Sequence, residues 1–239
     1  MSTVTDACRV LREDRELADA VAEAHRPQAI RDCVARVIPL RPGRWAAQAA
    51  TLSGGVGLLV LDGLLVRRVG IDERYGAELL GQGDLLRPWQ ENPTLTLDAV
   101  WRILKPTRLA ILDEEFANRV APYPQLTACL VGRALQRSRN LVVNLAIIHQ
   151  SRVDVRLHML FWYLAGRWGR VGAKGLVLPV RLTHTVLADL VAARRPTVTS
   201  ALSLLARQEL IESVGGGWLL RGEPPGELLQ LSPVSIQAS

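Results

Sequence analysis

Residues Leu182–Ile211, LTHTVLADLVAARRPTVTSALSLLARQELI, contain two short amphipathic segments separated by a pair of alanines. Apolar side chains recur at helical spacing in each segment, which predicts a helix before the alanines and a second helix after them. The apolar positions are Leu182, Leu187, Leu190 and Val191 in the first segment and Val198, Leu202 and Leu205 in the second. Because Ala192 and Ala193 are small, the two helices can cross closely.

The second of these helices begins with two arginines, and Pro196 follows them at a place where its fixed φ suits the first helical turn. Three hydroxyl side chains come next. This pattern predicts a helix-turn-helix, whose second helix places its N-terminal residues in the major groove of DNA. A purely structural helical hairpin is the alternative. The candidate DNA contacts are Arg194, Arg195, Thr197, Thr199 and Ser200, with Thr183 and His184 from the start of the first helix.

The segment that follows favours the DNA-binding interpretation. Residues Leu210–Leu220 contain two short apolar runs on either side of three consecutive glycines, which predicts a strand, a tight turn and a second strand. A winged helix ends in this way. We therefore predict a winged helix-turn-helix domain over residues 151–222, with a helix at Val153–Arg170 and a short strand at Leu176–Val180.

The composition is that of an ordinary globular protein. The chain has 239 residues, enough for about two domains, and 49% of them are hydrophobic. No apolar run approaches the ~20 residues that a membrane helix requires, and the N-terminus is polar, so we expect no signal peptide and a cytoplasmic protein. The scattered cysteines, Cys8, Cys33 and Cys129, indicate neither a disulfide framework nor a zinc site, and no cofactor is expected.

The formal net charge of +6 is concentrated in one part of the chain. Residues 119–175 hold 9 basic and 1 acidic side chains, whereas residues 1–118 hold 15 and 17 and residues 176–239 hold 5 and 5. A basic segment next to a helix-turn-helix can meet the phosphates that flank the bases. The alternative is a solvated helix face.

The N-terminal part of the chain predicts a helical preface and a sheet. Residues 1–38 have helical spacing, and the following residues form short apolar runs joined by glycine turns, which indicates an antiparallel β roll within residues 1–122. The predicted strands are Trp45–Leu52, Gly57–Leu61, Leu64–Ile71, Ala77–Leu80, Leu95–Leu104 and Arg108–Leu112.

A long helix is predicted over residues 123–150, where no proline follows Pro124. An apolar stripe recurs close to every 3.5 residues, so a second copy of the helix is the expected partner and the protein is expected to be a homodimer. Packing of the stripe onto the chain's own β domain is the alternative. The stripe consists of Leu126, Leu130, Ala134, Leu141, Leu145 and Ile148. The fold class is then α+β, and residues 223–239 are expected to be a flexible tail.

This order of elements resembles the cyclic-AMP receptor protein and fumarate–nitrate regulator (Crp/Fnr) family of bacterial transcription factors. The most specific matches are Leu182–Ile211 and the segments Leu80–Leu85 and Leu109–Asp113. The resemblance implies that an effector in the β roll repositions the DNA-binding domains. It also aligns Arg195 with the family's first base-contacting position, whereas Pro196 and a serine at position 200 depart from the family pattern and imply a different operator.

The resemblance also implies where an effector would bind, and the sequence departs from the family there. Cyclic-nucleotide binders hold the phosphate with a Gly-Glu pair and an arginine, but the corresponding residues are Arg87-Pro88 and Leu97-Asp98. We therefore do not expect control by cyclic AMP. The cysteine cluster for iron–sulfur sensing is absent, and the β region has no histidine to hold haem.

We expect a DNA-binding regulator and not an enzyme, and two other functions are the alternatives. In the first, the β roll is a protein-interaction module coupled to DNA binding. In the second, it is a cupin-type enzyme, although such metal sites need clustered histidines and the four present, His25, His149, His158 and His184, lie outside the predicted strands. The expected partners are double-stranded DNA and a second copy of the chain, with RNA polymerase as a further candidate and an unknown effector. No membrane partner is expected.

Overall fold

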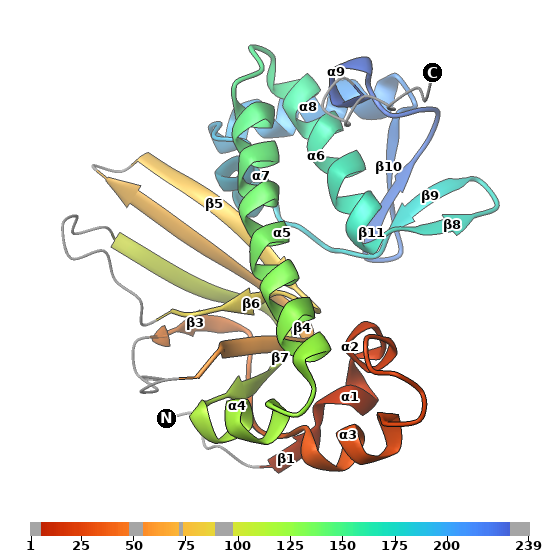
Figure 1. Cartoon of the computed structure of the whole chain (residues 1–239). Helices are drawn as coiled ribbons and strands as arrows, with labels where there is room; N and C mark the ends of the chain where they lie inside the picture. Colours follow the sequence, from red (N-terminus) through yellow and green to blue (C-terminus); the bar gives the residue numbers. More distant parts are fainter. Residues whose placement is uncertain (1–5, 48–54, 72–73, 89–97, 230–239) are drawn as a thin grey trace, which may run out of the picture. The chain divides into compact units, whose positions relative to one another are not determined.

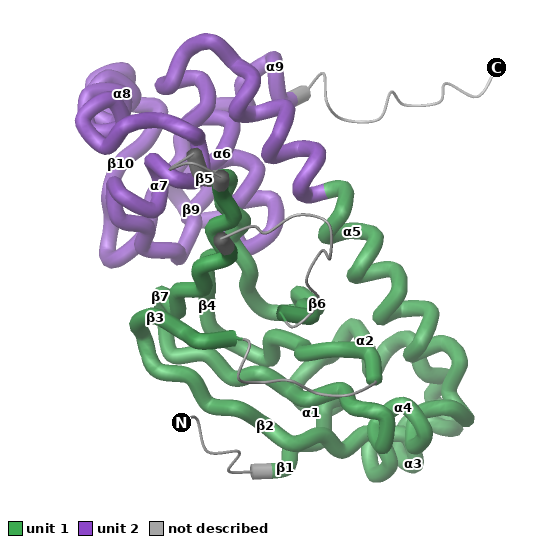
Figure 2. Tube along the Cα trace, turned by 90° about the vertical axis from the view of Figure 1, so that its left-hand side faces the viewer, with its two compact units in different colours: residues 1–139 green, residues 140–239 purple. Residues whose placement is uncertain are grey.

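The computed structural model describes residues 6–47, 55–71, 74–88 and 98–229. The chain divides into two compact units, residues 1–139 and residues 140–239 (Figure 2). The first unit is an antiparallel β roll with helices, and the second is helical with a small sheet (Figure 1). The predicted α+β fold is confirmed. No described helix is long and apolar enough to span a membrane.

The roll is one antiparallel sheet with the order β1-β2-β7-β4-β5, in which β3 also pairs with β7 and β6 with β4. Two of its strands are 15 residues long and carry most of the pairing. The bounds are β1 (Asp6–Arg9), β2 (Val34–Leu40), β3 (Gly43–Trp45), β4 (Gly57–Ile71), β5 (Arg74–Gly81), β6 (Leu85–Leu86) and β7 (Asp98–Leu112).

The two long strands correct the prediction of four short ones. Gly57–Leu61 and Leu64–Ile71 are both parts of β4, because Asp62–Gly63 forms a bulge and not a turn. A β-carbon at Gly63, whose φ is +100°, would lie 2.3 Å from the hydroxyl oxygen of Thr107 on β7. That buried hydroxyl accepts a hydrogen bond from Leu64 N and donates one to Lys105 O. The bulge therefore bends both strands without reversing them.

On β7 the predicted break between Leu95–Leu104 and Arg108–Leu112 is likewise absent from the described residues, which begin at Asp98. The strand predicted at Trp45–Leu52 was also wrong in its first residues. Strand β3 ends at Trp45, and positions 48–52 lie outside the described residues.

The last four residues of β7, Leu109–Leu112, are buried on both faces of the strand, which explains why this part of its sequence is continuously apolar. Leu109 and Ile111 point into a core inside the roll with Trp101. Ala110 and Leu112 point into a second core that the helices cover. A strand between two cores has no alternating polar face.

The prediction of a wholly helical preface over residues 1–38 was wrong. Helices α1 (Val10–Glu13), α2 (Arg15–Asp19) and α3 (Arg26–Asp32) are flanked by strands β1 and β2. Pro39 lies within β2 opposite Arg108 of β7, and the described pairing of β2 with β1 runs from Val34 to Val37. Short apolar spacings in this region suited a helix and a strand equally.

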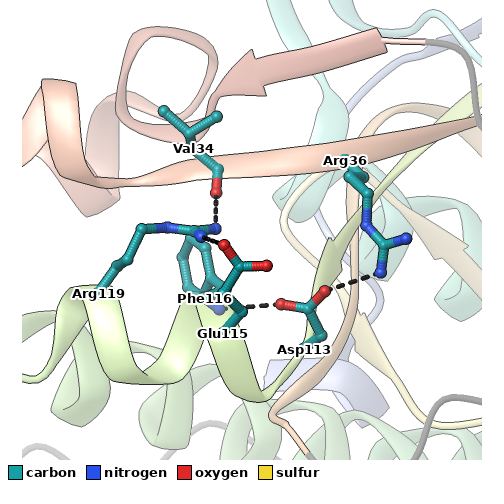
Figure 3. Close-up of polar contacts among 6 residues, drawn as sticks. All are labelled: Val34, Arg36, Asp113, Glu115, Phe116 and Arg119. Carbon is teal, nitrogen blue, oxygen red and sulfur yellow. Dashed lines mark hydrogen bonds and ion pairs between the residues drawn. The ribbon is translucent and has the colours of Figure 1, made fainter.

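Helix α4 (Glu114–Val120) is capped by Asp113, whose Oδ1 accepts a hydrogen bond from Phe116 N at 2.9 Å. The other carboxylate oxygen accepts one from Arg36 on β2 at 2.9 Å (Figure 3). Arg119 of the same helix pairs with Glu115 and donates to Val34 O at 2.6 Å. These contacts fix α4 against the edge of β2.

Helix α5 (Pro124–Ile148) follows, and two arginines one turn apart attach its first part to the roll. Arg133 donates to both oxygens of Asp14, at 2.5 and 2.8 Å, and to Glu16 at 2.9 Å. Arg137 binds both oxygens of Glu78 on β5, at 2.6 and 2.8 Å, and donates to Leu85 O at 3.2 Å. These paired, bidentate contacts define the buried face of α5.

The predicted apolar stripe of α5 divides between two faces of the helix. Leu126 and Leu130 are buried in the core of unit 1, as the alternative of packing onto the β domain expects. The later positions Leu141 and Leu145 are exposed. The exposed large apolar residues of α5 are Val131, Leu135, Leu141, Val142 and Leu145.

In unit 2, α6 (Val153–Trp168) leads into a four-stranded antiparallel sheet of order β10-β11-β9-β8. The predicted strand Leu176–Val180 is β9 (Gly175–Leu178), but its hairpin partner β8 (Arg170–Gly172) was not predicted. The predicted tail contains a short helix, α9 (Gly226–Leu229), at its start. Its remaining positions, 230–239, lie outside the described residues.

Asp14 supplies a test of this packing. The side chains of Asp14 and Arg133 are both buried, with 9% and 10% of their surface exposed. Asp14 also accepts the capping hydrogen bond from Leu17 N. Asp14→Ala leaves the guanidinium of Arg133 buried with only Glu16, so we expect the free energy of unfolding of unit 1 to fall by about 3–5 kcal/mol. Urea denaturation measures this change, and amide hydrogen exchange in the strands of the roll shows that it belongs to unit 1.

The matched control is Arg15→Ala. Arg15 pairs with Asp19 on the surface, and its side chain is 95% exposed. We expect a loss below about 0.5 kcal/mol for this exposed pair. Equal losses in the two variants would contradict the assignment of Asp14.

Candidate nucleic-acid interface

The predicted helix-turn-helix is formed by α7 (His184–Leu190) and α8 (Arg195–Arg207). Thr183 caps α7, because its hydroxyl accepts a hydrogen bond from Val186 N at 3.3 Å. The apolar positions that the sequence assigned to the two inner faces are buried, with 0–6% of each residue exposed. Helix α8 also packs against α6, so the hairpin is held by a third helix.

The turn between the two helices contains a residue in an uncommon backbone conformation. Ala192 has a φ of +49°, in the left-handed region that favours glycine. Ala193 N donates to Ala188 O at 2.9 Å, which closes the turn after α7. The chain then extends through Arg194, with φ −79° and ψ 144°, before α8 begins.

The predicted DNA-contacting residues gather at the start of α8 and are exposed, apart from the partly exposed His184. Arg194 and Arg195 make no side-chain hydrogen bond or ion pair within the described part of the chain, so their guanidinium groups are available. The hydroxyl of Thr199 lies 2.9 Å from Nδ1 of His184 and also donates to Arg195 O at 3.1 Å. Ser200 donates to Pro196 O at 3.3 Å. The first turns of α7 and α8 thus form one polar surface.

The predicted wing is present. Strands β10 (Ile211–Val214) and β11 (Gly217–Leu220) pair in register from Ile211 with Leu220 to Val214 with Gly217. Gly215 and Gly216 form the turn with φ +44° and +94°, which suits the twist of a two-residue hairpin loop. Trp218 stacks on Phe161 of α6 with ring centroids 4.8 Å apart, so the wing is packed onto the helices.

Most cations of the basic segment, residues 119–175, make contacts within the protein. Of the segment's nine cations, seven make contacts within the protein: Arg119, Arg133, Arg137, Arg139, Arg152, Arg156 and Arg167. The contacts of Arg119, Arg133, Arg137 and Arg156 join elements that are distant in sequence or satisfy backbone carbonyls. Sequence reasoning missed them, because a local count of charges does not show partners as far away as 119 residues.

The interior of the roll holds a row of polar side chains across β7, β4 and β5. Arg67 stacks over the ring of Trp101 at 5.5 Å and lies 4.0 Å from Glu78, the carboxylate that Arg137 binds. Of the positions that the resemblance assigned to phosphate binding, Arg87 is exposed, Leu97 lies outside the described residues, and only the backbone of Asp98 is described.

The other candidate chemistries gain no support from the described residues. No group of three potential metal ligands occurs among them, and the four histidines lie in or beside helices. Burial raises the pKa of Cys8 to about 11 and that of Cys33 to about 12, so both thiols stay protonated at neutral pH. Burial also raises the pKa of Cys129. The surface at α7 and α8 is therefore the candidate site.

The fold and this surface define a winged helix-turn-helix DNA-binding protein with a β roll before it. Residues 155–222 match the family model of the Crp-like helix-turn-helix domain. A comparison with curated protein sequences found no match.

Solved structures share the fold over most of the chain. A mutant of CooA from Carboxydothermus hydrogenoformans has a TM-score of 0.61 and 15% identity, with 96% of this chain and 95% of that chain covered. FixK2 from Bradyrhizobium japonicum has a TM-score of 0.59 and 15% identity, covering 86% and 99%. A CRP/FNR-family regulator from Thermus thermophilus has a TM-score of 0.52 and 21% identity, covering 78% and 93%. The resemblance is confirmed for the helix-turn-helix domain and for the fold: residues 155–222 match the Crp-like domain model, and the chain shares the fold of these solved structures.

Replacing alanine with glycine is expected to change the free energy of unfolding in opposite directions at the two neighbouring positions 192 and 193 of the turn. Ala192→Gly removes a left-handed strain of ~1–2 kcal/mol but adds freedom to the unfolded chain, for a net gain of about 0.5 kcal/mol. Ala193→Gly removes no such strain, because its φ is not positive, so we expect a loss of ~0.5–1 kcal/mol. Thermal unfolding followed by the fluorescence of Trp162 and Trp218 measures both, and a loss in both variants would contradict the turn geometry.

Proposed function

We propose that the protein is a sequence-specific transcription regulator that binds DNA as a homodimer and is not controlled by cyclic AMP. The observation that carries this proposal is the pair of unengaged arginines at the exposed start of α8, beside a wing that the same domain holds in place. A helix N-terminus with such donors fits the major groove, where base edges present acceptors.

Arg195 is the residue that we assign to base recognition. Its guanidinium can donate two hydrogen bonds to O6 and N7 of guanine, a contact worth ~1–3 kcal/mol of discrimination. Ser200 uses its hydroxyl hydrogen on a carbonyl of α8, which leaves its oxygen as an acceptor for the amino group of adenine or cytosine, whereas the Thr199 hydroxyl also faces Nδ1 of His184. Pro196 can contribute only apolar contact. The operator is therefore expected to differ from the family's familiar site.

The homodimer is supported by the exposed apolar side of α5. Val131, Leu135, Val142 and Leu145 follow one another at spacings of 4, 7 and 3 residues, with Ser138 at the intermediate position, which is a heptad pattern. Because a helix turns about 100° per residue, these positions lie opposite the face that carries Arg133 and Arg137. The two arginines hold one face of α5 on the roll and leave the heptad face for a second copy.

The lack of control by cyclic AMP is supported by the residues at the family's phosphate-binding positions. Arg87-Pro88 replaces the Gly-Glu pair, Leu97 stands where the family's phosphate-binding arginine is expected, and the next residue is the acidic Asp98. Inside the roll, Arg137 already pairs with Glu78. A protein partner of the roll remains the second candidate for an input signal, and RNA polymerase is a candidate partner of the DNA-bound dimer.

Selection from a random DNA pool, followed by electrophoretic shifts, tests the proposal. We expect enrichment of a two-fold symmetric site with half-sites about one helical turn apart, and the same affinity with and without cyclic AMP. We expect Arg195→Ala to weaken binding to that site by ~1–3 kcal/mol and to relax the preference at one base pair of each half-site.

Arg170→Ala is the control for Arg195→Ala. Arg170 is exposed on β8, at the edge of the sheet away from the wing strand β10. Its loss is expected to weaken binding to all sequences alike. An equal change of specificity in both variants would overturn the assignment of α8, and the absence of any sequence preference would overturn the proposed function.

The dimer is tested by Val142→Glu. The side chain is 64% exposed in the single chain, so the substitution leaves the fold intact but places a carboxylate in the expected heptad contact. We expect a monomer in sedimentation equilibrium and a specific affinity for DNA reduced at least about tenfold, because one half-site contact is lost. Gln136→Glu adds the same charge on another side of α5 and should remain a dimer. Dimerisation of both variants would contradict the use of this face.

A further inference from the structure

Arg156, in the first turns of α6, contacts the backbone at two places that are far apart in the sequence. Its Nε donates to Gln150 O at 2.6 Å, just after the end of α5. Its Nη1 donates to Val191 O at 3.1 Å and Ala192 O at 3.3 Å, in the turn before α8. All four residues belong to unit 2, so these contacts lie within one compact body.

These carbonyls are the kind that need an external donor. The last carbonyls of a helix lack an intrahelical partner and carry partial negative charge, which a cation at the helix C-terminus stabilises. Gln150 follows the end of α5, and Val191 caps the end of α7. One planar guanidinium therefore donates hydrogen bonds at the ends of two helices, α5 and α7. A lysine ammonium lacks the rigid fork of donors that this arrangement requires.

The contact to the turn falls on its strained residue. Ala192 has a φ of +49°, and the carbonyl of Val191 belongs to a residue that is fully buried. The conformation of this turn sets the direction in which Arg194 leads into α8. A donor fixed on α6 thus restrains the entry of the recognition helix.

We infer that Arg156 is a positioning residue that fixes the start of α8 relative to the end of α5, and thereby the distance between the two recognition helices of the dimer. This inference rests on the proposed function, because α5 is the expected dimer contact. If the hydrogen bonds of Arg156 hold the end of α5 and the turn before α8 at a fixed separation, then the dimer binds tightly only to operators with one half-site spacing. Loss of these hydrogen bonds relaxes the spacing requirement without removing any contact to a base.

The experiment measures affinity for three versions of the selected operator, with one base pair deleted, unchanged or inserted between the half-sites. Wild-type protein is expected to lose about tenfold or more for either change, an effect like that of one mismatched base pair. Arg156→Ala is expected to lose less than about threefold between spacings, while its affinity for an isolated half-site stays within about twofold of wild type. Arg156→Lys is expected to lie between them.

The control is Arg152→Ala, which removes an exposed arginine just before the same helix, paired only with Asp154 in the described contacts. It should keep the wild-type preference for one spacing. Circular dichroism establishes that each variant is folded, and Arg156→Lys carries the test if Arg156→Ala is not.

The outcomes separate the two proposals. A variant of Arg156 that retains the full spacing preference overturns the positioning role. An equal loss at every spacing and at the half-site also overturns it, because that result indicates direct contact with DNA or general damage. Wild-type protein without any sequence preference overturns the proposed function itself.

Discussion

The paired contacts of Arg133 and Arg137 with the roll determine which side of α5 is buried. Each guanidinium binds both oxygens of a carboxylate, Asp14 in one case and Glu78 in the other. Bidentate contacts of this kind fix orientation as well as distance. Since the two arginines are one helical turn apart, they set the rotation of α5 about its axis. The exposed heptad positions on its opposite side are a direct consequence.

The same contacts explain why the apolar stripe of α5 could not be read correctly from the sequence. Leu126 and Leu130 belong to the core of unit 1, whereas Leu141 and Leu145 are exposed. Periodicity reports that an apolar residue recurs, but it does not say which surface covers each one. Arg137, which lies between the apolar positions Ala134 and Leu141 of the predicted stripe, is the signal that was available. A charged residue near the edge of an apolar stripe often marks an internal partner, but that partner's position requires the fold.

Much of unit 2 was predictable because its information is local. Helical spacing and the glycines of the wing are each decided by neighbours within a few residues, and both appear as expected. Strand β8 was missed because Arg170–Gly172 has three exposed residues and no apolar alternation. In the roll, Asp62–Gly63 looks like a turn, and only its pairing with Thr107 on another strand makes it a bulge. The errors in unit 1 thus occur where distant pairing overrides local turn chemistry.

The residues of the candidate interface could be predicted from the sequence, but the contacts among them could not. The sequence placed the arginines and hydroxyls at the start of α8, yet it did not reveal that Thr199 faces His184 or that the hydroxyl hydrogens bond to carbonyls of α8. It also grouped nine cations as one basic segment, of which Arg156 joins two backbone segments of unit 2 and Arg133 joins α5 to α2. Cations that already have partners inside the protein are less available to DNA phosphates. With Arg194 and Arg195 exposed beside a proline, recognition depends on a small number of directed donors and on how firmly the turn before them is held.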